Sequence, residues 1–425
     1  MRFDDLSSWL RWQETLHPST IDLGLDRVAV AWSRLYSRPV PFPVITIAGT
    51  NGKGSCAAML EAVYRAVGYR TACYTSPHLL RYNERIRLDG DEVSDADLCA
   101  AFERVDAARG ASTLTYFEFG TLAALDLFVR FRPDLAILEV GLGGRLDAVN
   151  ILDSDVAVVM TIARDHTTWL GETLDEIAFE KAGIFRTGKP AIVGHRAPSP
   201  ALTCRAEALG SELFLLGRDF DREVDALQWH WQGQGVSRTD LPPPALRGDF
   251  QLDNAATALM AVSCLSGRLP VPDGDLRLGL RRVRVHGRFQ VLPGEVTWIL
   301  DVAHNAQAAQ ALADNLRSLD CHGRVHGVLG VLADKDPKVI AEPMVGLVDA
   351  WYLGQAKDPR ALSSAKLRAA LQGIAAHGEL NEYPGIEDAL GAAAASARPG
   401  DCVLAFGSFT TVEAALLRTH RDAAS

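Results

Sequence analysis

The sequence predicts an α/β protein built from two domains, and three observations lead to this prediction. Short apolar runs rich in β-branched residues, typical of buried strands, alternate with longer stretches of helical character. The chain has 425 residues, which is too long for one ordinary domain. A new series of strands follows the Pro293-Gly294 turn, so we predict domains at 1–290 and 291–425.

Composition and charge exclude several classes of protein. Hydrophobic residues make up 48% of the chain and charged residues 23%, which is the balance of a globular protein. The formal net charge of −10 argues against a general affinity for nucleic acid or anionic membranes. No apolar run approaches membrane-spanning length, and the N-terminus lacks the order of a signal peptide. The seven cysteines form no CxxC pair, so we expect neither a disulfide framework nor a zinc site, and we expect a reducing cytoplasm.

The first domain is organised around residues 44–55, where a predicted strand, a glycine-rich turn and a helix that stops at Gly68 follow one another. Backbone N–H groups in such a turn converge on a phosphate at the positive end of the helix. Lys53 adds a charge for the outer phosphates, and Ser55 adds a hydroxyl that can reach Mg²⁺. Ile47 stands where the usual P-loop has its first glycine, so a turn without a ligand remains an alternative.

The remaining elements are predicted from periodicity and from turn residues. The N-terminal segment is expected to be helical, with a second helix through 28–36. Helices are also expected to start at Ser94 and Thr115, and an alanine-rich helix at Asp253. Residues 211–250 favour β-hairpins, because they combine Trp229 and Trp231 with glycines and prolines. The predicted strands, by residue number, are 44–47, 71–74, 135–140, 156–160, 296–302, 324–329, 349–353 and 402–406.

Polar side chains follow three of these strands. Ser76 follows the strand at 71–74, Glu139 lies at the end of the next one, and His166 follows the strand at 156–160. The carboxyl ends of parallel strands meet at one edge of an α/β sheet, so these groups are expected to share a site with the P-loop. A hydroxyl, a carboxylate and an imidazole are plausible ligands for a divalent metal. Glu139 as a cap or ion-pair partner and His166 as an ordinary surface histidine remain alternatives.

Taken together, the ordered motifs resemble the folylpolyglutamate synthase and dihydrofolate synthase family of the Mur ligase superfamily, and the bacterial bifunctional enzymes most of all. The likeness covers almost the whole chain. It rests on the glycine-rich loop and on these motifs: Thr20-Ile21-Asp22-Leu23-Gly24, Thr75-Ser76-Pro77-His78-Leu79, Arg81-Tyr82-Asn83-Glu84-Arg85-Ile86, Leu138-Glu139-Val140-Gly141-Leu142-Gly143-Gly144-Arg145-Leu146-Asp147, Asp165-His166-Thr167, Glu180-Lys181-Ala182-Gly183-Ile184-Phe185-Arg186, Gly287-Arg288-Phe289 and Asp301-Val302-Ala303-His304-Asn305.

The resemblance implies a P-loop ATPase domain followed by a smaller Rossmann-like α/β domain, and an ATP-dependent ligation. Dihydropteroate or a reduced folate supplies a carboxylate, ATP phosphorylates it, and the amine of L-glutamate attacks the acyl phosphate. The protein then has mainly to align two anions and neutralise their charge. The resemblance also points to a monomer. Because it assigns Asn254 and Asp301, on opposite sides of the predicted boundary, to one nucleotide, we expect the two domains to close on ATP with Arg288 at their junction.

The resemblance carries roles onto individual residues, with Lys53, Lys181 and His166 as the catalytic set. Lys181 matches the family lysine that becomes a carbamate, which helps to hold a second Mg²⁺; an ordinary surface lysine is the alternative. The ATP-binding positions are Asn51, Gly52, Lys53, Gly54, Ser55, Asn254, Arg288 and Asp301. The Mg²⁺ ligands are Ser76, Glu139 and His166. The pterin-side positions are Thr20, Ile21, Asp22, Leu23, Thr115, Tyr116, Phe117, Glu118, Leu146, Asp147 and Ala148, and the glutamate candidates are His304 and Ser408.

Some alternatives remain open at this stage. Thr20 or Asp22 could simply cap the helix that follows them. The enzyme could be a folylpolyglutamate synthase that only extends tetrahydrofolates, or a muramyl-type amino-acid ligase. A P-loop nucleotide-binding protein without ligase chemistry belongs to a different class, and it would bind nucleotide without substrate-dependent release of ADP.

Overall fold

The computed structural model describes residues 2–225, 228–319, 321–374 and 378–424. Within these ranges the chain forms two compact units: residues 1–245 with 251–284, and residues 246–250 with 285–425. The short segment 246–250 therefore packs with the second unit although it precedes part of the first. The division predicted at residue 290 stays a prediction. Among the described helices, none is long and apolar enough to cross a membrane.

The first unit contains a large sheet, called the first sheet, and a small antiparallel sheet, called the hairpin sheet. The strands of the first sheet are β1 Val44–Ala48, β2 Thr71–Tyr74, β3 Ile86–Leu88, β4 Asp91–Glu92, β5 Leu135–Glu139, β6 Val156–Val159, β7 Pro190–Val193 and β8 Glu212–Leu215. Their order in the sheet is β4-β3-β2-β5-β1-β6-β7-β8. The strands from β2 to β8 in this order are parallel, whereas β3 and β4 are antiparallel additions at one edge.

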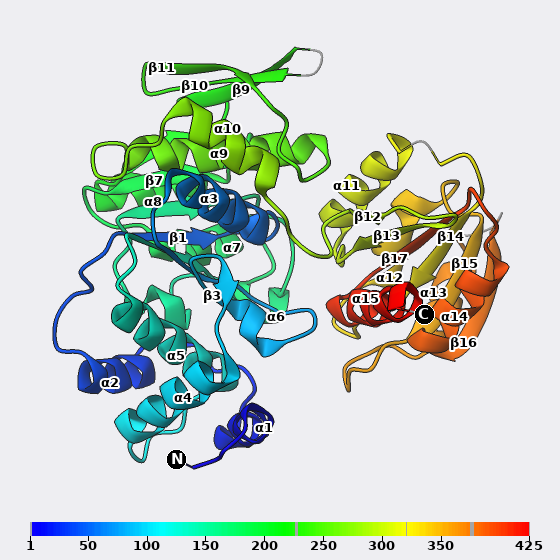
Figure 1. The fold of residues 1–425 in the computed structure, drawn as a ribbon, viewed down its shortest axis with the longest axis horizontal. Coiled ribbons are helices and arrows are strands. Elements are labelled where there is room, and N and C mark those ends of the chain that lie inside the picture. Colours follow the sequence, from blue (N-terminus) through cyan, green and yellow to red (C-terminus); the bar gives the residue numbers. More distant parts are fainter. Residues whose placement is uncertain (1, 226–227, 320, 375–377, 425) are drawn as a thin grey trace. The chain divides into compact units, whose positions relative to one another are not determined.

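Helices cover both faces of the first sheet. They are α1 Leu6–Leu16, α2 Asp26–Leu35, α3 Lys53–Val67, α4 Asp95–Arg109, α5 Tyr116–Phe131, α6 Thr167–Leu170, α7 Leu174–Lys181, α8 Pro200–Leu209, α9 Asp249–Cys264 and α10 Asp273–Arg282, with 3₁₀ turns η1 Tyr82–Arg85, η2 Ala148–Ile151 and η3 Ala182–Ile184. Figure 1 shows α3, α9 and α10 on one side of β1 and α2, α4 and α5 on the other. The central strands β1 and β5 are buried along their whole length, as parallel strands between helices must be.

The hairpin sheet consists of β9 Phe220–Asp225, β10 Gln228–Gly233 and β11 Val236–Leu241. It lies beside α10 in Figure 1. Its antiparallel pairing confirms the predicted β-hairpins for most of 211–250, but β8, at the start of that region, lies parallel to β7 in the first sheet. Trp229 and Trp231 are buried, and each indole N–H donates a hydrogen bond to a backbone carbonyl, of Pro242 and Ala256 respectively. The Trp231 bond ties this sheet to α9, because Ala256 lies in that helix.

The second unit is a smaller α/β structure. Its strands are β12 Gln290–Leu292, β13 Thr297–Asp301, β14 Val325–Leu329, β15 Ala350–Gln355, β16 Glu379–Gly385 and β17 Cys402–Phe406, in the order β12-β13-β17-β14-β15-β16. Only β12 is antiparallel among these described strands. The helices are α11 Ala306–Arg317, α12 Pro337–Ala341, α13 Ser364–Leu371, α14 Ile386–Ser396 and α15 Phe409–Ala424, with η4 Glu342–Met344. The predicted fold class is therefore confirmed.

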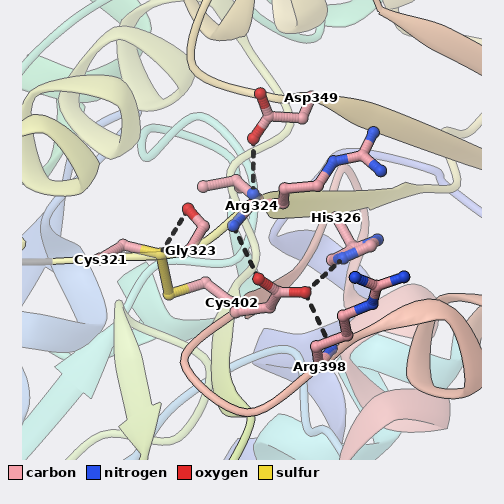
Figure 2. Close-up of a disulfide and its surroundings, with 9 residues drawn as sticks. Cys321, Gly323, Arg324, His326, Asp349, Arg398 and Cys402 are labelled. Carbon is pink, nitrogen blue, oxygen red and sulfur yellow. Dashed lines mark hydrogen bonds and ion pairs between the residues drawn. A yellow bond between two sulfur atoms is a disulfide. The ribbon is translucent and has the colours of Figure 1, made fainter.

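Two expectations from the sequence need correction. The alanine-rich helix α9 begins at Asp249 rather than at Asp253, so its first turn contains Gln251. The cysteines were expected to stay unpaired, but Cys321 and Cys402 form a disulfide whose Cα atoms are 6.5 Å apart. Figure 2 shows this disulfide beside the hydrogen bonds of Arg324 and Arg398 at the start of β17. Spacing along the sequence missed the pair because 81 positions separate its two members.

Candidate active site

The carboxyl ends of β1, β2, β5 and β6 bring four segments to one edge of the first sheet, since these strands are parallel neighbours. The glycine-rich loop follows β1, and Ser76 lies just beyond β2. Glu139 is the last residue of β5, and His166 follows β6. The edge predicted from the strand pattern is therefore present.

The loop between β1 and α3 has glycines where a side chain would collide with neighbouring residues. Gly52 caps α3 with a left-handed φ of 89°, so Lys53 is the first residue of the helix. A Cβ atom at Gly49 would lie 2.7 Å from Cβ of Met160, and one at Gly52 would lie 2.7 Å from Oδ1 of Asn254. Glycine is therefore required at Gly49 and Gly52, whereas Ile47 is a buried residue inside β1.

Two lysine side chains converge on this loop. Nζ of Lys53 donates hydrogen bonds to the carbonyl oxygens of Gly49 at 2.9 Å and Thr50 at 3.1 Å. Nζ of Lys181, at the end of α7, donates to the same Gly49 carbonyl at 3.0 Å. The two lysine amines at this turn thus come from elements that lie far apart in the sequence.

Lys181 is buried, with only 4% of the residue exposed, so the alternative of an ordinary surface lysine is wrong. Burial, together with the positive charge of Lys53, lowers the pKa of Lys181 to about 7. A large share of this amine is therefore uncharged at neutral pH. An uncharged amine is the form that reacts with carbon dioxide.

Of the residues proposed to hold a metal, Glu139 presents its carboxylate to the loop. Glu139 is buried, and its Oε2 accepts a hydrogen bond from the backbone N–H of Ser76 at 3.0 Å. A Cβ atom at Gly54 would lie 3.8 Å from both carboxylate oxygens, so the carboxylate faces the loop. Among the described residues, no three His, Cys, Asp or Glu side chains gather closely enough to hold a metal by themselves. A carboxylate beside a phosphate loop suits Mg²⁺, which retains waters and binds phosphate oxygens.

His166 lies at the same edge, in a less common backbone conformation. Its φ is +51°, and it stands immediately before α6. Its backbone N–H donates to Oδ1 of Asp165 at 2.9 Å, and its Nε2 lies 4.0 Å from Oδ2 of the same carboxylate. The imidazole is 42% exposed, so it is accessible to a ligand at this edge.

The pterin-side residues from three stretches of the sequence are linked in the structure. Arg27 donates to Oδ2 of Asp22 at 2.7 Å and to Oε1 of Glu118 at 2.9 Å. Glu118 also forms a capping box with Thr115 at the start of α5. The carboxylates of Asp22 and Glu118 therefore hold their two segments together in the free protein. This is a structural role in addition to the substrate-binding role expected from the sequence.

The third stretch, 146–148, ends a loop whose start is in contact with Phe117. A Cβ atom at Gly141 would lie 2.5 Å from Cζ of Phe117, so the Phe117 ring covers the loop that leads to Asp147. Asp147 is buried, and its carboxylate accepts hydrogen bonds from the N–H groups of Leu142 at 2.8 Å and Val149 at 3.0 Å. Burial raises the pKa of Asp147 to about 6. The remaining residues predicted for the pterin side are Tyr116, Leu146, Ala148 and the segment 20–23.

Four further predicted residues lie in the second unit. Asp301 ends β13, and its carboxylate accepts from the N–H groups of Phe289 at 2.7 Å and Ala303 at 2.8 Å, while burial raises its pKa. The Arg288 guanidinium lies 5.5 Å from the centre of the Phe409 ring, and the His304 ring centre lies 6.2 Å from it. Ser408 is buried, and its hydroxyl accepts from the N–H of Thr411, so it caps α15.

Comparison with known proteins identifies the family. The model of the Mur ligase middle domain matches residues 47–262, and that of the Mur ligase glutamate ligase domain matches 287–409. A dihydrofolate synthase/folylpolyglutamate synthase of Escherichia coli is 42% identical over 96% of this chain and 94% of its own length.

Two solved structures extend the likeness to the whole fold. E. coli FolC in complex with DHPP and ADP superposes with a TM-score of 0.92 at 40% identity, covering 99% of each chain. A bifunctional folylpolyglutamate synthase/dihydrofolate synthase with Mn, AMPPNP and L-glutamate bound gives a TM-score of 0.89 at 41% identity, covering 98% of each chain. The glycine-rich loop and the sheet of the second unit thus belong to an architecture that this chain shares with those structures. The chain belongs to the dihydrofolate synthase/folylpolyglutamate synthase family of ATP-dependent Mur ligases.

Proposed function

We propose that this protein joins L-glutamate to dihydropteroate, giving dihydrofolate, and to tetrahydrofolate or its polyglutamates. The observation that carries the proposal is the meeting of Lys53 and Lys181 at the Gly49 carbonyl, beside the buried carboxylate of Glu139. This arrangement suits phosphoryl transfer to a carboxylate, since Lys53 supplies positive charge where negative charge must gather and Lys181 offers an amine that can be modified. The relatives' printed names and ligands support the choice of substrates.

The reaction proceeds in two balanced steps. A carboxylate oxygen of the pterin substrate attacks the γ-phosphorus of ATP, the bond to the bridging β–γ oxygen breaks, and ADP leaves. The glutamate amine then attacks the acyl carbon, inorganic phosphate leaves, and the nitrogen loses a proton. A carboxylate is a poor acyl donor, and phosphorylation provides the leaving group.

The chain's own residues serve these steps by binding and orientation. Loop residues 51–55 hold the ATP phosphates, with Asn254 on α9, and we assign Arg288 and Asp301 to the nucleotide as well. Residues 20–23, 115–118 and 146–148 take the pterin, and His304 and Ser408 are the glutamate candidates. Ser76, Glu139 and His166 would hold Mg²⁺, which when bound neutralises phosphate charge.

We further propose that Lys181 is carbamylated and so helps to hold a second Mg²⁺. Its burial and its lowered pKa support this, because an ammonium group in this position would repel a metal ion whereas a carbamate would attract it. We also propose that the enzyme acts as a monomer in the cytoplasm.

A coupled assay of ADP release tests the function. Purified protein is given ATP, Mg²⁺ and L-glutamate with either dihydropteroate or tetrahydrofolate, and the ligated product is identified by mass spectrometry. We expect release of ADP with each acceptor and none without an acceptor. Release with tetrahydrofolate alone would assign the chain to folylpolyglutamate synthesis only, and release with neither acceptor would refute the proposal.

A further inference from the structure

Gln251 is a buried polar residue whose side chain reaches the phosphate loop from another helix. It lies in the first turn of α9, and only 1% of it is exposed. Its Nε2 donates a hydrogen bond to Oγ of Ser55 at 3.3 Å. Ser55 is itself 3% exposed, so this bond lies in the interior. A buried amide is costly unless its hydrogen bonds are made, and here one of them is made to the loop hydroxyl.

The same amide group also holds Asn254. Oε1 of Gln251 accepts a hydrogen bond from Nδ2 of Asn254 at 2.9 Å. The remaining polar atom of Asn254, Oδ1, faces the loop, because a Cβ atom at Gly52 would lie 2.7 Å from it. Gln251 therefore connects Ser55 with Asn254, and both of these residues are assigned above to the nucleotide.

This arrangement restricts the Ser55 hydroxyl, which would otherwise rotate freely. A serine oxygen has two acceptor lone pairs and one proton. The N–H of Gln251 occupies one lone pair, so the other lone pair and the proton are directed elsewhere. A hydroxyl whose orientation is set before the nucleotide arrives loses less freedom during phosphoryl transfer.

We propose that Gln251 is a positioning residue for phosphoryl transfer, acting on the Ser55 hydroxyl through its N–H and on Asn254 through its carbonyl oxygen. The inference rests on the proposed function, in which the loop holds the ATP phosphates. Gln251 itself is not assigned a contact with the nucleotide.

Steady-state kinetics separate the effect of Gln251 on Ser55 from its effect on Asn254. We expect Gln251→Leu, which keeps a buried side chain of similar size, to lower kcat about tenfold, the effect of losing roughly one hydrogen bond. It should also raise KM for ATP. In a Ser55→Ala background, Gln251→Leu should lower kcat by less than about twofold further, because the group it orients is already gone. Gln251→Leu should still raise KM for ATP in that background, because Ser55→Ala leaves the hydrogen bond between Gln251 and Asn254 intact.

A binding measurement gives a readout that does not depend on turnover. Calorimetric titration with AMPPNP is carried out with Mn²⁺ present and with the metal chelated. We expect Gln251→Leu to weaken binding more strongly with Mn²⁺ than without it, and we expect Ser55→Ala to remove that difference. Thr257→Val is the matched control, because Thr257 is a buried polar residue of α9 whose hydroxyl donates to the Asp253 carbonyl. This control should lower Tm and leave kcat and KM unchanged.

The outcomes distinguish this inference from the proposed function. Suppose that the wild type ligates glutamate and that the loss of kcat in the double variant equals the product of the losses in the two single variants. Gln251 would then act independently of Ser55 and would be only a structural residue. Wild-type kcat for Gln251→Leu with a lowered Tm would lead to the same conclusion. Should Gln251→Leu fail to fold, Gln251→Met is measured in the same cycle with the same expectations. Absence of ligation by the wild type would overturn the proposed function instead.

Discussion

At the scale of single residues, the two lysines at the Gly49 carbonyl have different environments and therefore different expected roles. Lys53 begins α3 and is half-buried, whereas Lys181 is buried at the end of α7. Positive charge at a helix N-terminus is unfavourable in the absence of an anion. We therefore expect Lys53 to meet a phosphate and, as proposed above, Lys181 to act as a carbamate.

Removal of Lys53 should affect turnover far more than folding. We expect Lys53→Ala to lower kcat by at least about 100-fold, because a charge beside the transferring phosphate is lost. Its Tm should change by less than about 3 °C, since the side chain lies outside the apolar core. Lys189→Ala is the control, as Lys189 forms an exposed ion pair with Asp155. A fully active Lys53→Ala enzyme would refute the assignment of the phosphate loop.

Replacement of Lys181 tests the carbamate directly. We expect Lys181→Ala to have very low activity that acetate or another small carboxylate partly restores, because the anion can occupy the vacated space. Lys181→Arg keeps a positive charge and should not be rescued. Mass spectrometry of the native protein under added bicarbonate should show the mass of one bound CO₂. Wild-type activity in Lys181→Arg would exclude the carbamate.

At the scale of secondary-structure elements, Arg27 joins the start of α2 to the start of α5. Its guanidinium bridges Asp22 and Glu118, and its side chain is 26% exposed. Such a partly buried bidentate link holds the loop 20–25 against the first turn of α5. The pterin-side residues of both segments therefore depend on one cation that is not assigned to the substrate.

Loss of this link should impair the pterin side selectively. We expect Arg27→Met to raise KM for dihydropteroate about tenfold, since it leaves two carboxylates without their shared partner, and to leave KM for ATP unchanged. Arg104→Met is the control, because Arg104 pairs with Asp126 farther along α5. The control should lower Tm without changing either KM. Equal rises in KM for both substrates in Arg27→Met would argue against a local role.

At the scale of the whole molecule, the disulfide between Cys321 and Cys402 is a covalent link whose contribution to stability can be measured by reducing it. It joins the segment after α11 to the first residue of β17 and closes a loop across a sequence separation of 81. By the chain-entropy model, a loop of this length restricts the unfolded chain by about 4.5 kcal/mol. The bond therefore stabilises the second unit wherever conditions permit it to form.

Reduction should reveal this contribution. We expect a reductant to lower the Tm of the wild type and to have no effect on Cys321→Ser. Thiol titration in denaturant should count two more thiols after reduction than before it. Cys204→Ser, which removes an exposed free thiol, serves as the control and should behave as the wild type. An unchanged Tm and thiol count on reduction would show that the two cysteines remain thiols.

Local signals in the sequence were sufficient for most elements. The apolar runs that became β1, β5, β6 and β17 were recognisable because a buried strand needs only its own residues to be apolar. The start of α5 was recognisable because its cap involves residues three positions apart. The pattern of residues predicts the start of α9 at Asp253, four residues after its start in the structure, so Gln251 falls outside the predicted helix.

The sequence by itself determined the α/β class, the phosphate loop and, through its ordered motifs, the family. Only the tertiary structure decided which distant side chains meet: Lys181 with Gly49 across 132 positions, Arg27 with Glu118 across 91, and Gln251 with Ser55 across 196. The physical reason is that strands and caps are set by neighbours within a few residues. Contacts between loops depend instead on the order in which strands are placed in a sheet, and β1 lies between β5 and β6, which follow it much later in the chain.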